Sequence, residues 1–157
     1  MGYRLLLLVS LLFTSLVCAH DGGLQLNQQM PEAEYKDQYD REHMLPGSAQ
    51  ILLFTESKRS GQLVMKVLEG MTEADLKAKG IVYLTSAGTT SSFLADMFGL
   101  PNVSRLPYPV LLDEEGMKSE AYPHQRNQVS VIRLSGGVIE QIEFTDKAET
   151  LKQLLAL

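Results

Sequence analysis

Two continuous apolar runs, residues 50–55 and 81–85, constrain the fold of this chain more than any other feature of its sequence. Each run is short, rich in aliphatic side chains and bounded by polar or turn-forming residues, which is typical of a strand buried on both faces of a sheet. Between the runs, residues 63–71 repeat apolar side chains at the spacing of one helix face. Strands that alternate with helices pair in parallel, so the sequence predicts an α/β domain around a central sheet.

Capping residues and helix breakers set the expected helix boundaries. Ser60-Gly61 is expected to begin the first helix. Thr72 and Asp75 form a capping-box pattern for a second helix, which ends at Gly80. Two shorter helical segments are predicted at residues 91–98 and 117–122.

The C-terminal part adds an antiparallel hairpin and a last helix. Residues 129–134 and 138–144 predict two strands joined by a tight turn at residues 135–137. Asp146 and Glu149 are spaced as a capping pair for the last helix. The side chains expected in the core of the sheet are Ile51, Leu53, Val82, Leu84, Val131 and Ile132.

The N-terminus has the pattern of an export signal. Arg4 supplies a positive charge, and residues 5–17 form an apolar core too short to span a bilayer. We therefore expect residues 1–19 to be a cleaved signal peptide and the protein to be periplasmic. The alternative is a lipoprotein anchored through Cys18, although the residues before this cysteine match that pattern poorly.

The expected domain organisation follows from the patterning after the signal. Residues 20–34 are mostly polar and lack periodicity, so they are expected to form a flexible tether. Residues 35–157 then form one domain, long enough for a core of its own. Residues 30–45 predict either a short hairpin or an irregular lead-in.

Composition excludes several classes of function. The chain has 14 Lys and Arg against 19 Asp and Glu, a net charge of −5, and no basic cluster. Nucleic-acid binding is therefore not expected. The histidines, His20, His43 and His124, are too far apart in sequence to predict a metal site, and we expect neither a metal nor another cofactor.

Several segments together resemble one superfamily. Residues 37–40 read DQYD, residues 108–116 read YPVLLDEEG, and residues 129–139 form the predicted strand, turn and strand. In this order, and together with the strand at 51–54, they resemble the thioredoxin-like fold, in its branch of peroxiredoxins and periplasmic thiol–disulfide oxidoreductases. The resemblance implies a three-layer sandwich with a central mixed sheet and helices on both faces.

The resemblance also implies a redox site that this chain lacks. Redox-active relatives carry a cysteine, often in a CxxC pair, at the helix N-terminus after the first core strand, where the thiolate is stabilised. Counted along the chain, Arg59 and Gln62 fall at the two cysteine positions, and Gln128 falls where relatives have a cis-proline. Cys18 is the only cysteine. We therefore expect no thiol–disulfide oxidoreductase or peroxidase activity, and no catalytic residue is assigned.

Two hypotheses of function follow. The first is a non-catalytic binding or assembly module of the bacterial cell envelope, which contacts a protein partner through the surface of the former redox site. The residues expected on this surface are Glu56, Lys58, Arg59, Ser60, Gln62, Asn127 and Gln128. The second is a cysteine-independent enzyme or small-ligand carrier that uses the cleft of the same fold.

Overall fold

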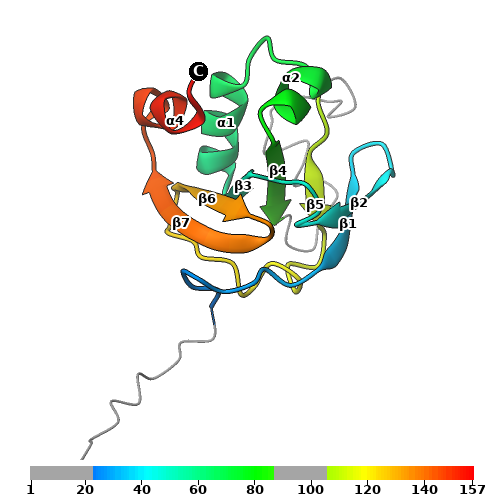
Figure 1. Ribbon diagram of the computed structural model, residues 1–157. Helices are drawn as coiled ribbons and strands as arrows, with labels where there is room; N and C mark the ends of the chain where they lie inside the picture. The colour runs from blue at the N-terminus through cyan, green and yellow to red at the C-terminus, as the bar shows by residue number, and fades with distance from the viewer. Residues whose placement is uncertain (1–22, 87–105) are drawn as a thin grey trace, which may run out of the picture.

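One mixed sheet organises the molecule, with strand order β2-β1-β5-β4-β3-β6-β7 (Figure 1). The computed structural model describes residues 23–86 and 106–157. The strands are β1 (Ala33–Asp37), β2 (Glu42–Leu45), β3 (Ile51–Thr55), β4 (Ile81–Ser86), β5 (Leu111–Asp113), β6 (Val129–Ser135) and β7 (Val138–Thr145). The helices are α1 (Lys58–Val67), α2 (Glu73–Ala78) and α4 (Ala148–Leu155).

The pairing of the central strands confirms the predicted α/β arrangement. β3 pairs in parallel with β4, and β4 pairs in parallel with β5. On its other side β3 pairs antiparallel with β6, which forms the predicted hairpin with β7. Residues 30–45, for which the sequence left two possibilities, contain the antiparallel hairpin of β1 and β2.

The two faces of the sheet bury different sets of side chains. Ile51 and Leu53 point to one face, where they form a core with side chains of α1, α2 and α4. Leu52 and Phe54 alternate with them and pack on the other face against Met30. Figure 1 shows the three helices above the sheet, with the N-terminal segment and the loop before β6 below it.

Most of the predicted core and helix positions agree with this arrangement. Five of the six core side chains named above are buried, while Val82 is half-buried. The helix predicted at residues 91–98 lies outside the described residues. No helix in the described parts of the chain is long and apolar enough to cross a membrane.

The segment expected to be a tether, residues 20–34, is packed from residue 24 onward, so this prediction is corrected. The Leu24 amide donates to the Ala121 carbonyl at 2.7 Å, and the Met30 amide donates to the Gly137 carbonyl at 2.9 Å. Met30 itself is 1% exposed. The segment lacks periodicity because backbone hydrogen bonds to loops and to the start of β7, rather than one apolar face, hold it in place.

Two further local predictions are wrong. Residues 117–122 form turns and bends instead of a helical turn, because the buried Asp113 carboxylate accepts hydrogen bonds from both the Ser119 amide and hydroxyl at 2.7 Å. At α4, the N-cap is Lys147 and no side chain caps it. The Lys147 amide donates instead to the Thr145 hydroxyl at 3.1 Å, so Asp146 and Glu149 do not form a capping pair.

The residues that carry the resemblance at positions 37–40 have a structural role. The Asp37 carboxylate closes the β1–β2 turn, because it accepts a hydrogen bond from the Arg41 amide at 3.0 Å. The Gln38 side chain then donates to the Tyr108 carbonyl at 2.8 Å and accepts from the Val110 amide at 2.7 Å. Gln38 thus joins the hairpin to the segment that enters β5.

Candidate functional site

The candidate site lies where β3 ends and α1 begins. Ser57 is the N-cap of α1, with an extended backbone at φ −134° and ψ 153°. It forms a capping box with Ser60, since each serine hydroxyl accepts from the backbone amide of the other at 3.3 Å. Ser60 therefore does not begin the helix, as the sequence predicted, but occupies its third position.

The position of the N-cap changes the correspondence with a CxxC pair. Ser57 and Ser60 have the spacing of such a pair and lie at the helix start, whereas Arg59 and Gln62 lie within the helix. The two hydroxyl oxygens are 2.9 Å apart. Judged by position at the helix N-terminus, two serine hydroxyls occupy the places where the resemblance implies cysteine thiols. A hydroxyl group can form neither a thiolate nor a disulfide.

The loop before β6 lies against the start of α1. The imidazole Nε2 of His124 is 3.4 Å from the Glu56 carboxylate, and its Nδ1 is 2.9 Å from the Tyr122 carbonyl. The strand register, in which Phe54 pairs with Ser130, brings the end of β3 beside the start of β6. The contact thus joins Glu56 to the loop before β6 through His124, a residue outside the predicted surface.

The members of the predicted surface differ in exposure. Lys58, Arg59 and Gln62 are exposed on the first turns of α1. Glu56, Asn127 and Gln128 are half-buried. Ser60 is 0% exposed, so it belongs to the support of the surface and is removed from the surface itself.

Beneath this surface lies a cluster of buried hydroxyl groups. The Thr55 hydroxyl, at the end of β3, is 3.1 Å from the Tyr83 hydroxyl and donates to the Thr85 hydroxyl at 3.1 Å. Burial raises the pKa of Tyr83, which keeps the phenol neutral. The Ser130 hydroxyl does not belong to this cluster: Ser130 is paired with Phe54, so it points to the other face of the sheet, where it is buried without a hydrogen-bond partner among the described residues. The cluster joins the ends of β3 and β4 through hydroxyl groups.

The shortest ion-pair contact among the described residues lies elsewhere, at the β1–β2 turn. The Asp37 carboxylate is 2.7 Å from the Arg41 Nε and 2.9 Å from the His43 Nε2. Burial acts to raise the pKa of Asp37, but hydrogen bonds from His43 and Arg41 outweigh it and lower the pKa. Because His43 and His124 belong to separate contacts, they do not form one site. The residues of the described ranges contain no group of three or more potential ligands arranged to hold a metal ion.

The surroundings of Gln128 also differ from a redox site. The peptide bond before it is not cis; the one cis bond in the described ranges precedes Pro46. Asn127 adopts a left-handed conformation with φ 61°, and the Gln128 side chain donates to the Gln125 carboxamide at 3.0 Å. The loop is therefore shaped by its own polar side chains.

Comparison with known proteins supports the fold. No family model matches the chain, and no curated protein matches it. Among solved structures, the thioredoxin domain of a thiol-disulfide oxidoreductase from Bacteroides vulgatus is similar, with a TM-score of 0.55 at 12% identity over 85% of this chain and 99% of that one. AhpC from Mycobacterium tuberculosis is similar too, with a TM-score of 0.55 at 10% identity over 85% and 92%.

A peroxiredoxin-like protein from Aquifex aeolicus has a TM-score of 0.52 at 10% identity over 84% of this chain and 86% of that one. The chain has a thioredoxin-like fold. At such low identities the likeness concerns the fold alone, and the activities in these names belong to those proteins. Because Cys18 is its only cysteine, this thioredoxin-like protein has no CxxC pair.

Proposed function

We propose that this chain is an exported, non-catalytic thioredoxin-like protein of the bacterial cell envelope, and that it binds a protein partner through the start of α1 and the loop before β6. One observation carries the proposal. The helix N-terminus where the resemblance puts a redox pair holds Ser57 and Ser60, whose hydroxyls are used in a capping box. The scaffold of the site is kept while its sulfur is replaced.

Exposure and charge support a contact surface. Lys58 and Arg59 are exposed next to each other, and the first turn of α1 contains no acidic residue. Glu56, the nearest carboxylate in sequence, is paired with His124 at 3.4 Å. The exposed part of the surface is therefore locally basic in a protein whose net charge is −5. The export-signal pattern of residues 1–19 supports a location outside the cytoplasm.

Photo-crosslinking in cells that export the protein tests the partner surface. A photoreactive amino acid at position 59 is expected to capture a protein partner, whereas the same group at exposed position 77 of α2 is expected to capture none.

Charge-reversal variants test the same surface without a crosslinker. The double variant Lys58→Glu/Arg59→Glu is expected to lose binding to the captured partner. The matched variant Lys77→Glu/Lys152→Glu, which reverses two other exposed cations, is expected to retain it. Equal capture at both positions, or equal binding by both variants, contradicts this surface.

Activity assays test the non-catalytic part of the proposal. The exported form, purified and checked for its N-terminus by mass spectrometry, is expected to show no insulin reduction and no peroxide turnover. Thiol chemistry requires a thiolate, which neither serine can supply. Robust turnover by the form that begins at His20 would overturn the proposal.

A further inference from the structure

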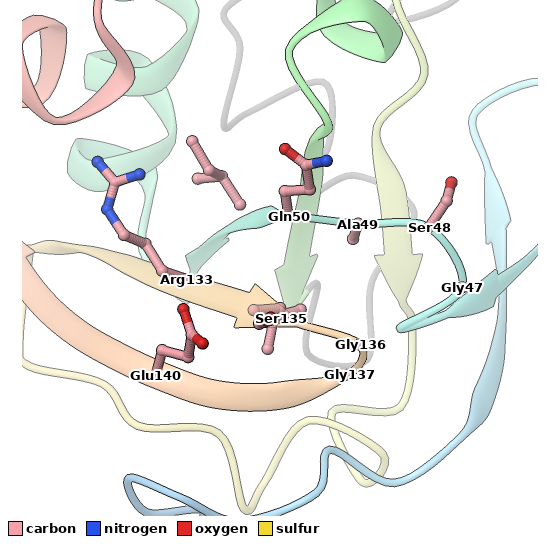
Figure 2. A pocket seen from close by; sticks show the side chains of 11 residues that line it. Gly47, Ser48, Ala49, Gln50, Arg133, Ser135, Gly136, Gly137 and Glu140 are labelled. Atoms are coloured by element: carbon pink, nitrogen blue, oxygen red, sulfur yellow. The ribbon is translucent and has the colours of Figure 1, made fainter.

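A cavity of about 490 Å³ lies at the N-terminal end of β3, at the opposite end of this strand from Ser57. Its walls are the turn at residues 47–50, the end of β6 and the Gly136-Gly137 turn of the hairpin. Figure 2 shows this pocket from close by. Its volume is in the range of small-molecule sites, which is roughly 300–1,000 Å³.

Arg133 supplies a positive charge to this pocket. It lies near the end of β6, opposite Ile51 of β3, and is half-buried. Its Nη2 group donates a hydrogen bond to the Leu154 carbonyl of α4, and this bond fixes the direction of the side chain. Among the residues that the structure describes, no carboxylate lies within 4.0 Å of its guanidinium. A partly desolvated cation with no anionic partner favours an anion from outside the chain.

Glu140 supplies a negative charge to the same pocket, and a β-bulge places it there. Arg133 pairs with Gln141 and Leu134 pairs with Ile139, so Glu140 is the extra residue on β7. Bulges redirect side chains and are common next to binding sites. The two-glycine turn already closes this hairpin, with Ser135 opposite Val138, so the turn itself does not require the bulge.

The pocket therefore presents two opposite charges that do not neutralise each other. Figure 2 shows Arg133, Glu140 and Gln50 turned toward the same side of the strands. Arg133 and Glu140 form no ion pair within 4.0 Å, and no cation in the described ranges lies that close to Glu140. Ile51, on the same face of the sheet as Arg133, contributes an apolar part to the lining.

We propose that this pocket binds a small zwitterion of the class of free amino acids. Its carboxylate lies on the Arg133 guanidinium, its ammonium group lies on the Glu140 carboxylate, and its apolar side chain lies over Ile51, which shares the face of Arg133. A phosphate or a dicarboxylate fits less well, because Glu140 repels it. A ligand without charge leaves Arg133 and Glu140 desolvated and unpaired. The inference is independent of the partner surface at the start of α1.

Titration of the ¹⁵N-labelled exported protein with L-leucine, followed by amide chemical shifts, tests this site. Isocaproate and isopentylamine keep the apolar part of leucine and carry only one of its two charges. We expect leucine to shift the amides of Ser48, Gly136 and Gly137, and each single-charge analogue to bind at least about tenfold more weakly, because it forms one charge-assisted contact instead of two. Absence of localised shifts up to tens of millimolar leucine overturns the proposal.

A pair of carboxylate variants completes the test. Glu140→Gln is expected to weaken leucine binding about tenfold and not to weaken isocaproate binding, because the isocaproate carboxylate gains nothing from Glu140. Glu149→Gln removes the same charge from an exposed residue of α4, outside the pocket, and is expected to have no effect. Equal effects of the two variants, or equal affinity for leucine and isocaproate, show adventitious anion binding only and contradict the zwitterion site. Unchanged melting of both variants excludes unfolding as the cause.

Discussion

The starts of α1 and α2 use the same device and differ in the charges that surround it. Both helices begin with a capping box, Ser57 with Ser60 in α1 and Thr72 with Asp75 in α2. The first turn of α2 contains Glu73 and Asp75, which the helix dipole favours at an N-terminus. The first turn of α1 contains no acid and instead carries two cations.

The charges around the start of α2 stabilise that helix, whereas the charges around the start of α1 do not. α2 follows every local rule for a helix N-terminus, and its capping residues are exposed. α1 does not follow the rule that acidic residues are favoured in the first turn of a helix. This helix start lies at the end of the sheet where redox-active thioredoxin-like proteins have their cysteines. Departures from local rules are expected at functional sites, since selection there acts on contacts with other molecules. This contrast supports the choice of the start of α1 as the partner surface.

The largest expected effect comes from returning sulfur to the two positions of the α1 capping box. The double variant Ser57→Cys/Ser60→Cys is expected to form a reversible intramolecular disulfide, because the two hydroxyl oxygens are already 2.9 Å apart. Thiol titration and mass spectrometry in glutathione buffers measure it. The control Arg59→Cys/Gln62→Cys places both thiols on the regular part of the helix and is expected to remain reduced. If the control forms a disulfide more readily than the first variant, positions 59 and 62, and not 57 and 60, correspond to the cysteine pair of redox-active relatives.

The second prediction concerns how many side chains each helix buries in the core. α2 buries one side chain, Leu76, which is 2% exposed, whereas α1 buries several. Leu76→Ala is expected to lower the free energy of unfolding by roughly 2–5 kcal/mol, through lost burial and the cavity left behind. Urea denaturation measures the change, and Lys77→Ala on the exposed face of α2 is the control, expected within about 0.5 kcal/mol of the unmodified protein. A cost for Leu76→Ala no larger than that of the control would mean that α2 is not held by the core.

The third prediction concerns variants that reverse the charges in the first turns of α1 and α2. Lys58→Glu/Arg59→Glu is expected to raise the free energy of unfolding by about 0.3–1 kcal/mol for each reversed charge, because acids replace cations near the positive end of the helix dipole. Glu73→Lys is expected to lower it, in part because the contact of Glu73 with Arg41 at 3.3 Å is also lost. Both changes should shrink in high salt, which screens exposed charges. A loss of stability in the α1 variant would contradict the view that these cations serve binding at the expense of the helix.

The sequence predicted the parts of the molecule whose signals are local. β3, β4 and the β6–β7 hairpin follow from apolar runs and a two-glycine turn, and the cap of α2 follows from Thr72 and Asp75. The start of α1 did not follow, because Ser57 and Ser60 are both good caps. The choice between them depends on where β3 leaves the sheet beside β6.

The candidate site was predicted only in part, for a related reason. Glu56, Lys58 and Arg59 follow β3 in sequence, so position alone selected them. The contact of Glu56 with His124 joins loops far apart in the chain, and a single histidine carries no signal of it. The packing of residues 24–30 was also missed, because backbone hydrogen bonds to residues such as Gly137 leave no side-chain pattern.

The smallest expected effect is a pH response confined to one of the two capping boxes. Asp75 caps α2 with a carboxylate, and hydrogen bonds from the Thr72 hydroxyl and amide hold its pKa below the ordinary value. A carboxyl whose pKa is lower in the folded state stabilises the fold above its unfolded pKa of about 3.9, and this contribution is lost as the pH falls through the folded value. The serine pair of α1 does not titrate.

Amide hydrogen exchange, followed from neutral pH to well below the ordinary aspartate pKa of about 3.9, separates the two helix starts. Protection at Thr72 and Asp75 is expected to fall on acidification, while protection at Ser60 and Gly61 changes only with global stability. Asp75→Asn, which keeps an acceptor without a titrating group, is expected to remove the difference between the two helices. If both starts lose protection together in this variant, the response belongs to the whole domain, and the two capping boxes are not distinguished by the chemistry of their third residue.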